Sequence, residues 1–117
     1  MRMMVGRVVR AEAHPNADRI RIAIVDLGDG HIRQIVYGGT RVLQPGDLVP
    51  VAPPGSRLPN GTKMRRRRYR GVSSDGMLCS FQEMSGVLVD GPDEVHVLPS
   101  DLRPGLSIDD ARLGTVR

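Results

Sequence analysis

The chain has 117 residues, 39% of them hydrophobic, and its 17 Lys and Arg against 13 Asp and Glu give a net charge of +4. This length predicts one domain and the composition excludes a disordered tail. No apolar run approaches the roughly 20 residues that a membrane span needs. The first residues lack the apolar stretch of a secretory signal, and a single cysteine excludes an intrachain disulfide. These features predict a cytoplasmic domain with an anionic partner, such as nucleic acid or an acidic membrane surface.

The first half of the chain carries strand patterns. Residues 4–10 mix valines with arginines, and residues 20–27 alternate well enough for a half-buried strand. Gly28-Asp29-Gly30 predicts a hairpin turn, with residues 31–37 as the returning strand. The apolar run 48–52 predicts a fourth strand, although Pro50 should confine it to a sheet edge or a bulge.

The second half adds fewer elements. Residues 72–79 lead into a fifth strand, residues 81–85 have the only helical pattern, and residues 94–98 resemble a further strand in a tail rich in Pro and Gly. Five short strands with little helix predict an all-β domain built as a small closed or nearly closed barrel. We expect its core to span about residues 4–85, with a C-terminal extension over residues 86–117.

A dense block of positive charge lies between the fourth and fifth predicted strands. Residues 63–70 hold six cations and no carboxylate, whereas the rest of the chain has 11 cations and 13 carboxylates. Runs of charge are often solvated strand edges that discourage aggregation. Four consecutive arginines without nearby acids favour instead a patch that contacts phosphate, through Lys63, Arg65, Arg66, Arg67, Arg68 and Arg70. Side chains alternate along a strand, so at most half could line one groove unless the segment is a loop, and the sequence leaves both open.

Two polar segments add candidate contacts. Ser73-Ser74-Asp75-Gly76 has the composition of a turn, but beside the cations its hydroxyl and N–H groups are candidate donors to phosphate or to an RNA 2′-hydroxyl. The following Met77 is more typical of a core residue than of a contact. In the segment 14–19, Asn16 and Arg19 have ligand-binding chemistry, although Asn16 could equally cap a turn.

Neither a metal site nor a catalytic site is expected. His14 and Asp18 lack a third ligand for a metal. There is no P-loop, no GxGxxG after a strand and no CxxC, and Cys79 lies in an apolar run that favours a buried, inert thiol. We therefore expect no enzyme, no cofactor and no membrane partner. With only 3% aromatic residues, the chain offers few stacking platforms for single strands, which favours a folded RNA recognised by charge and shape.

The two polar segments also carry a family resemblance. His-Pro-Asn-Ala-Asp-Arg at 14–19 and Arg-Gly-Val-Ser-Ser-Asp-Gly-Met-Leu-Cys-Ser at 70–80 resemble the tRNA-binding OB-fold domain. That domain occurs in the β subunit of bacterial phenylalanyl-tRNA synthetase, as an appendix to methionyl-tRNA synthetases, and as small free-standing dimeric proteins. Residues 35–39, 51–61 and 98–101 also follow the β-subunit pattern, so the resemblance covers roughly residues 4–108.

The resemblance implies a five-stranded OB barrel that binds tRNA or similar structured RNA without catalysis. The RNA-facing positions of the family correspond to Asn16, Arg19, Arg70, Ser74 and Met77. Arg19 replaces the usual Lys, which keeps the charge but changes the donor geometry. Free-standing relatives leave a homodimer open, and the β-subunit pattern leaves association with a tRNA synthetase open.

Two functions of other classes remain as alternatives. Some free-standing relatives act as export-related chaperones, and a peptide-binding chaperone should tolerate high salt and expose an apolar groove. A protein–protein adaptor that docks on a tRNA synthetase should stay associated after nuclease treatment, whereas an RNA-bridged association should not.

Overall fold

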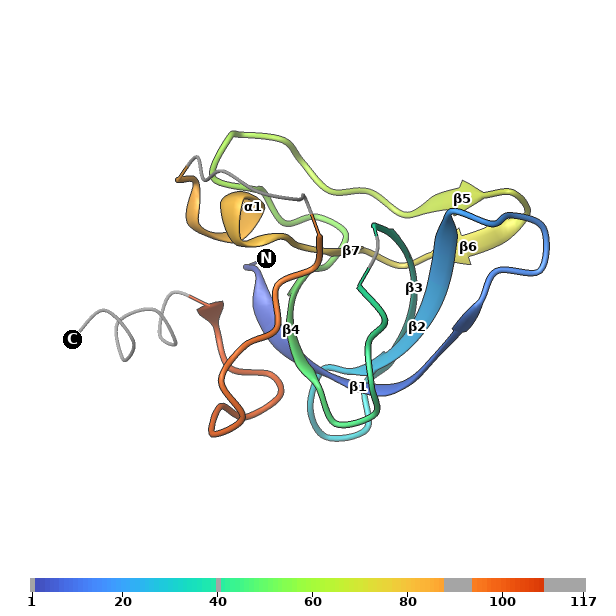
Figure 1. The fold of residues 1–117 in the computed structure, drawn as a ribbon. Helices are drawn as coiled ribbons and strands as arrows, with labels where there is room; N and C mark the ends of the chain where they lie inside the picture. Colours follow the sequence, from blue (N-terminus) through green and yellow to red (C-terminus); the bar gives the residue numbers. More distant parts are fainter. Residues whose placement is uncertain (1, 40, 88–93, 109–117) are drawn as a thin grey trace.

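The computed structural model describes residues 2–39, 41–87 and 94–108. It is mostly β-structure with one short helix (Figure 1). The elements are β1 (Met4–Ala13), β2 (Ile20–Asp26), β3 (Ile32–Gly38), β4 (Leu48–Ala52), β5 (Arg67–Tyr69), β6 (Val72–Ser74), β7 (Met77–Leu78) and α1 (Phe81–Ser85). None of the described residues forms a helix long and apolar enough to cross a bilayer.

The strands form a curled antiparallel sheet that confirms the expected all-β OB-type barrel. Its strand order is β3-β2-β1-β4-β7, and β5 and β6 form a separate two-stranded sheet. The end of β6 and the residue after it lie along β3, where the Asp75 N–H donates to the Gln34 carbonyl at 2.8 Å and the Val36 N–H donates to Ser74 Oγ at 2.9 Å. These bonds bring the two ends of the sheet together.

One long strand serves two partners. The first residues of β1, Met4–Arg7, pair with β4, and its later residues pair with β2. The register with β2 shifts between Val8 and Arg10, so Val9 forms a β-bulge. A bulge bends a strand and increases its twist, which lets β1 curve across the barrel.

The strand β4 is buried along its whole length because both of its faces are covered. Val49 and Val51 belong to the interior cluster of the barrel. Leu48 and Ala52 belong to a second cluster, which also contains Met84 of α1 and the later residues Leu98 and Ile108. A continuous apolar run in the sequence therefore reflects packing on two sides.

The expectation that Pro50 places its strand at an edge or a bulge is wrong. Strand β4 lies between β1 and β7. The Pro50 carbonyl accepts a hydrogen bond from the Cys79 N–H at 2.9 Å. Because the nitrogen and the carbonyl of one strand residue point to the same side, the Pro50 nitrogen also faces Cys79, which is the first residue after β7. Proline is tolerated there because no ladder hydrogen bond needs its missing N–H.

Two other strand predictions need correction. The predicted fifth strand, 72–79, is interrupted at Asp75 and Gly76, which separate β6 from β7. Gly76 has φ +127° and lies against the Ala52 carbonyl, a conformation and a close approach that suit only glycine. The predicted strand over 94–98 forms only isolated bridges, between Ser80 and Val95 and between Leu48 and Leu98. The helical prediction for residues 81–85 is confirmed, and Ser80 and Glu83 form a capping box at its start.

Candidate nucleic-acid interface

The cations predicted to contact phosphate lie in and before an exposed β-hairpin. Strands β5 and β6 pair from Arg67 opposite Ser74 to Tyr69 opposite Val72, and we call residues 65–74 the arginine hairpin. Arg65 and Arg66 lead into β5, Arg67 and Arg68 lie in it, and Arg70 lies in the turn. All six predicted cations are exposed. In Figure 1 the hairpin lies beside the loop that follows β1 and away from the segment 98–108.

The turn of the hairpin has an uncommon backbone. Arg70 has φ +52° and Gly71 has φ +87°, and two successive positive φ angles are those of a type I′ turn. The Arg70 carbonyl accepts a hydrogen bond from Asn16 Nδ2 at 3.1 Å. This bond joins the two motifs that carry the family resemblance.

A buried histidine makes a second connection to the same turn. His14 is 5% exposed, and its Nδ1 accepts a hydrogen bond from the Asn16 N–H at 3.0 Å. Its Nε2 therefore carries the proton and donates to the Tyr69 carbonyl at 2.8 Å. With both ring nitrogens engaged, His14 is a structural residue, and among the described residues no group of His, Cys, Asp and Glu could hold a metal ion.

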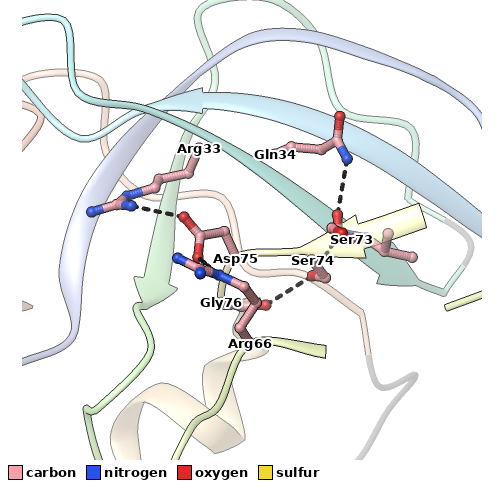
Figure 2. Close-up of polar contacts among 8 residues, drawn as sticks. Arg33, Gln34, Arg66, Ser73, Ser74, Asp75 and Gly76 are labelled. Atoms are coloured by element: carbon pink, nitrogen blue, oxygen red, sulfur yellow. Dashed lines mark hydrogen bonds and ion pairs between the residues drawn. The ribbon is translucent and has the colours of Figure 1, made fainter. Parts of the chain in front are cut away.

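The base of the hairpin is held by a carboxylate between two arginines (Figure 2). Arg66 Nε donates to Asp75 Oδ1 at 2.8 Å, and Arg33 Nη1 of β3 donates to Asp75 Oδ2 at 2.7 Å. Burial alone would raise the pKa of Asp75, but the hydrogen bonds from Arg66 and Arg33 outweigh it and hold the pKa below its ordinary value. Asp75 is therefore ionised at neutral pH.

The neighbouring Ser and Gly residues also make internal contacts, as Figure 2 shows. Gln34 Nε2 donates to the Ser73 carbonyl at 2.9 Å. Ser74 is 1% exposed, and its hydroxyl, which accepts from Val36, donates to the Gly76 carbonyl at 3.0 Å. Residues 73–76 thus attach the arginine hairpin to the barrel.

The cations predicted to contact RNA differ in whether their side chains have partners in the protein. Arg68 Nη2 donates to the Gly71 carbonyl at 3.1 Å, and Arg66 is held by Asp75. Within the described part of the chain, no side-chain hydrogen bond or ion pair engages the other cations predicted to contact RNA, which are Arg19, Lys63, Arg65, Arg67 and Arg70. Arg19, Arg70 and Asn16 line one hollow beside the turn. This hollow lies between the loop 14–19 and the arginine hairpin, and Asp18 also lines it.

The structure places the predicted contact residues in different environments. Asn16 and Arg19 are exposed, Met77 is half-buried against the second core cluster, and Ser74 is buried. Cys79 is buried as predicted, and burial raises the pKa of its thiol, which stays protonated at neutral pH.

The interpretation of the arginine run as free of nearby acids is wrong. Arg66 is paired with Asp75, which lies nine residues further along the chain but beside Arg66 in space. Sequence reasoning also missed Arg33 and Gln34, because nothing in their strand pattern indicates a polar partner on another element. The pairing of β3 with the segment after β6 is what brings them together.

Comparisons with known proteins agree with this geometry. Residues 3–107 match the family described as "Putative tRNA binding domain". The phenylalanine–tRNA ligase beta subunit of Symbiobacterium thermophilum is 43% identical over 108 residues, and that of Neisseria gonorrhoeae is 42% identical over 106 residues. Each alignment covers 91% of this chain but only 12% or 13% of the relative, so the chain spans about an eighth of their length.

A solved structure shows the same fold. The MetRS-related protein from Pyrococcus horikoshii superposes with a TM-score of 0.62 at 21% identity, covering 91% of this chain and 87% of that one. The family match extends over the barrel, the loop 14–19 and the arginine hairpin. The chain therefore belongs to the tRNA-binding domain family.

Proposed function

We propose that the domain binds tRNA or similar structured RNA, without catalysis, through the basic surface formed by the arginine hairpin and the loop 14–19. The observation that carries the proposal is a group of exposed cations on the loop 14–19 and in or just before the arginine hairpin whose side chains have no partner among the described residues: Arg19, Lys63, Arg65, Arg67 and Arg70. Guanidinium groups bind phosphate oxygens in pairs, and a polyanion rewards several such contacts through counterion release.

The chemistry of the surface favours a folded RNA over an unstructured strand. Tyr69, 40% exposed, is the only aromatic side chain of the arginine hairpin, so the hairpin offers little base stacking. Several cations on the surface of a folded domain suit the phosphate array of a folded RNA. We therefore expect contacts to the backbone and little discrimination among tRNAs. Binding to RNA of this kind would place the domain in the cytoplasm.

A salt titration of binding to bulk tRNA tests the proposal. If about five phosphates are neutralised, the log–log slope of affinity against salt should be roughly −3 to −5. Arg67→Ala should weaken binding to all tRNAs alike and make the slope shallower by about one. Arg103→Ala is the matched control, because it removes an exposed arginine from the segment away from the hairpin (Figure 1). A wild-type slope in the Arg67→Ala protein would contradict this assignment of the surface.

Competition separates the proposal from its alternatives. Duplex DNA should compete less well than tRNA, and an unfolded polypeptide should not compete. Weak binding to tRNA together with salt-tolerant binding to the polypeptide would overturn the proposal in favour of a chaperone. Because the relatives are subunits of a ligase, a pull-down of a tRNA synthetase that survives nuclease would identify an adaptor instead.

A further inference from the structure

Asp75 is a carboxylate at the base of a surface that we propose binds a polyanion. Simple electrostatics predicts that its negative charge opposes binding of phosphate. The side chain is nevertheless only 18% exposed, and both of its oxygens accept hydrogen bonds from arginines. The charge of the surface alone does not explain why a carboxylate lies at this position.

The contact with Asp75 leaves the phosphate-binding end of Arg66 free. Asp75 Oδ1 accepts from Nε of Arg66 (Figure 2), and no other hydrogen bond engages this guanidinium within the described part of the chain. A guanidinium has five N–H donors, so four remain on the two terminal nitrogens. The Arg66 side chain is still 68% exposed. Those donors are therefore accessible to a phosphate while the carboxylate holds the stem.

The other partner of Asp75 belongs to the barrel. Arg33 lies in β3, whose neighbour Gln34 accepts the Asp75 N–H and donates to the Ser73 carbonyl. The carboxylate is thus fixed by its backbone and by its side chain to a strand of the main sheet. Arg66 is thus attached, through Asp75, to the main sheet.

We propose that Asp75 is a positioning residue for RNA binding, which holds Arg66 so that its two terminal nitrogens are presented to one phosphate. The proposal rests on the proposed function above. An unrestrained arginine loses rotamer freedom when it binds, and a side chain that is already fixed avoids that loss. Positioning and simple electrostatics therefore predict opposite effects when the charge of Asp75 is removed.

The first test compares two variants that each remove one negative charge. Asp75→Asn should weaken tRNA binding roughly three- to tenfold, the size expected for freeing one long side chain. Asp18→Asn is the matched control, because Asp18 is exposed beside Arg19 and the described residues give it no side-chain partner. It should tighten binding by up to about twofold, as the loss of a surface charge predicts. Tighter binding by the Asp75→Asn protein would overturn the proposal.

A double-mutant cycle tests whether the effect passes through Arg66. In an Arg66→Ala background, Asp75→Asn should no longer weaken binding, because the residue that it positions is absent. An equal loss in both backgrounds would overturn the proposal and make Asp75 a residue of the fold alone. Asp75→Glu serves as a second variant if Asp75→Asn fails to fold, because it keeps the charge and displaces the carboxylate by one methylene. This variant should also weaken binding to tRNA. Wild-type affinity in the Asp75→Glu protein would contradict the proposal.

A readout without RNA keeps this test separate from the proposed function. The Arg66 Nε–H should give a slowly exchanging NMR signal in the wild-type protein that is lost in Asp75→Asn. If that signal behaves as expected but the wild-type protein does not bind tRNA, the proposed function fails while the contact stands. If the signal exchanges rapidly in the wild-type protein, the positioning proposal fails whatever the protein binds.

Discussion

Two turns of this molecule each place a non-glycine residue and the glycine after it at positive φ, but the non-glycine residues differ. The turn between β2 and β3 has φ +55° at Asp29 and +75° at Gly30, and the turn of the arginine hairpin has φ +52° at Arg70 and +87° at Gly71. Type I′ turns favour Asn, Asp or Gly at both central positions. Asp29 satisfies that preference. Arg70 does not, since a left-handed conformation costs an ordinary residue roughly 1–2 kcal/mol.

The two turns also differ in what holds them in place. The turn at Asp29 joins two strands whose buried side chains, such as Val25 and Ile35, already determine their register. The turn at Arg70 joins two short, exposed strands and is held by Asn16 and His14 from another loop. The proposed role of Arg70 in binding would account for a residue that is unfavourable for its turn in a segment of exposed cations.

The largest effect should come from breaking the attachment of the arginine hairpin. A Cβ on Gly76 would lie 2.7 Å from the Ala52 carbonyl oxygen, and its φ is +127°. Gly76→Ala should therefore lower the free energy of unfolding by about 3 kcal/mol or more. Gly30→Ala is the control, because nothing lies within 4 Å of its added Cβ, and its cost should be only about 1 kcal/mol. Urea denaturation measures both free energies of unfolding. Equal losses would contradict the close approach of Gly76 to the Ala52 carbonyl as the cause of the larger effect.

Exchanging the turn residues should move stability in opposite directions. Arg70→Asn should raise the free energy of unfolding by about 0.5–1 kcal/mol while weakening tRNA binding, because asparagine tolerates the left-handed conformation but lacks the charge. Asp29→Arg places an arginine at the corresponding position of the β2–β3 turn and should lower the free energy of unfolding by a similar amount. Parallel urea denaturation and tRNA titrations check both. A loss of stability in the Arg70→Asn protein would contradict the inference that the backbone of Arg70 is strained.

Removing the link between the two motifs should have a smaller effect. Asn16→Ala deletes the hydrogen bond to the Arg70 carbonyl, which is exposed to solvent, and should lower stability by about 0.5 kcal/mol. We expect hydrogen exchange of the backbone amides in the β5–β6 ladder to accelerate while β2 and β3 are unaffected. Unchanged exchange in this ladder would show that His14 alone holds the turn.

The smallest effect should appear only in acid. Because the folded-state pKa of Asp75 lies below its ordinary value of 3.8, its carboxylate stabilises the fold at higher pH. That stabilisation should be lost as the pH falls through the folded-state pKa, so unfolding should become easier below about pH 4. Asp75→Asn should lack this part of the pH dependence. Urea midpoints between pH 7 and pH 3 measure it, and identical profiles for the two proteins would contradict the assigned pKa direction.

Local patterns were sufficient for a large part of the fold. The strands over 20–26 and 32–38, their turn and the short helix follow from alternation, glycine and a capping box, which all act between near neighbours. The place of Pro50 could not be predicted, because it depends on where a strand from another part of the chain ends. The cationic cluster was also readable from the sequence, since six of its members lie within eight residues.

The sequence by itself determined the barrel class, the family motifs and the location of the positive charge. Only the tertiary structure decided how that charge is held, because the partners lie far apart along the chain: Arg33 is 42 residues from Asp75, and His14 is 55 residues from Tyr69. Hydrogen-bond partners at such separations are selected by closure of the sheet, which no local pattern records. The physical reason is that a side chain's chemistry is fixed by its type, whereas its partner is fixed by the packing of the whole fold.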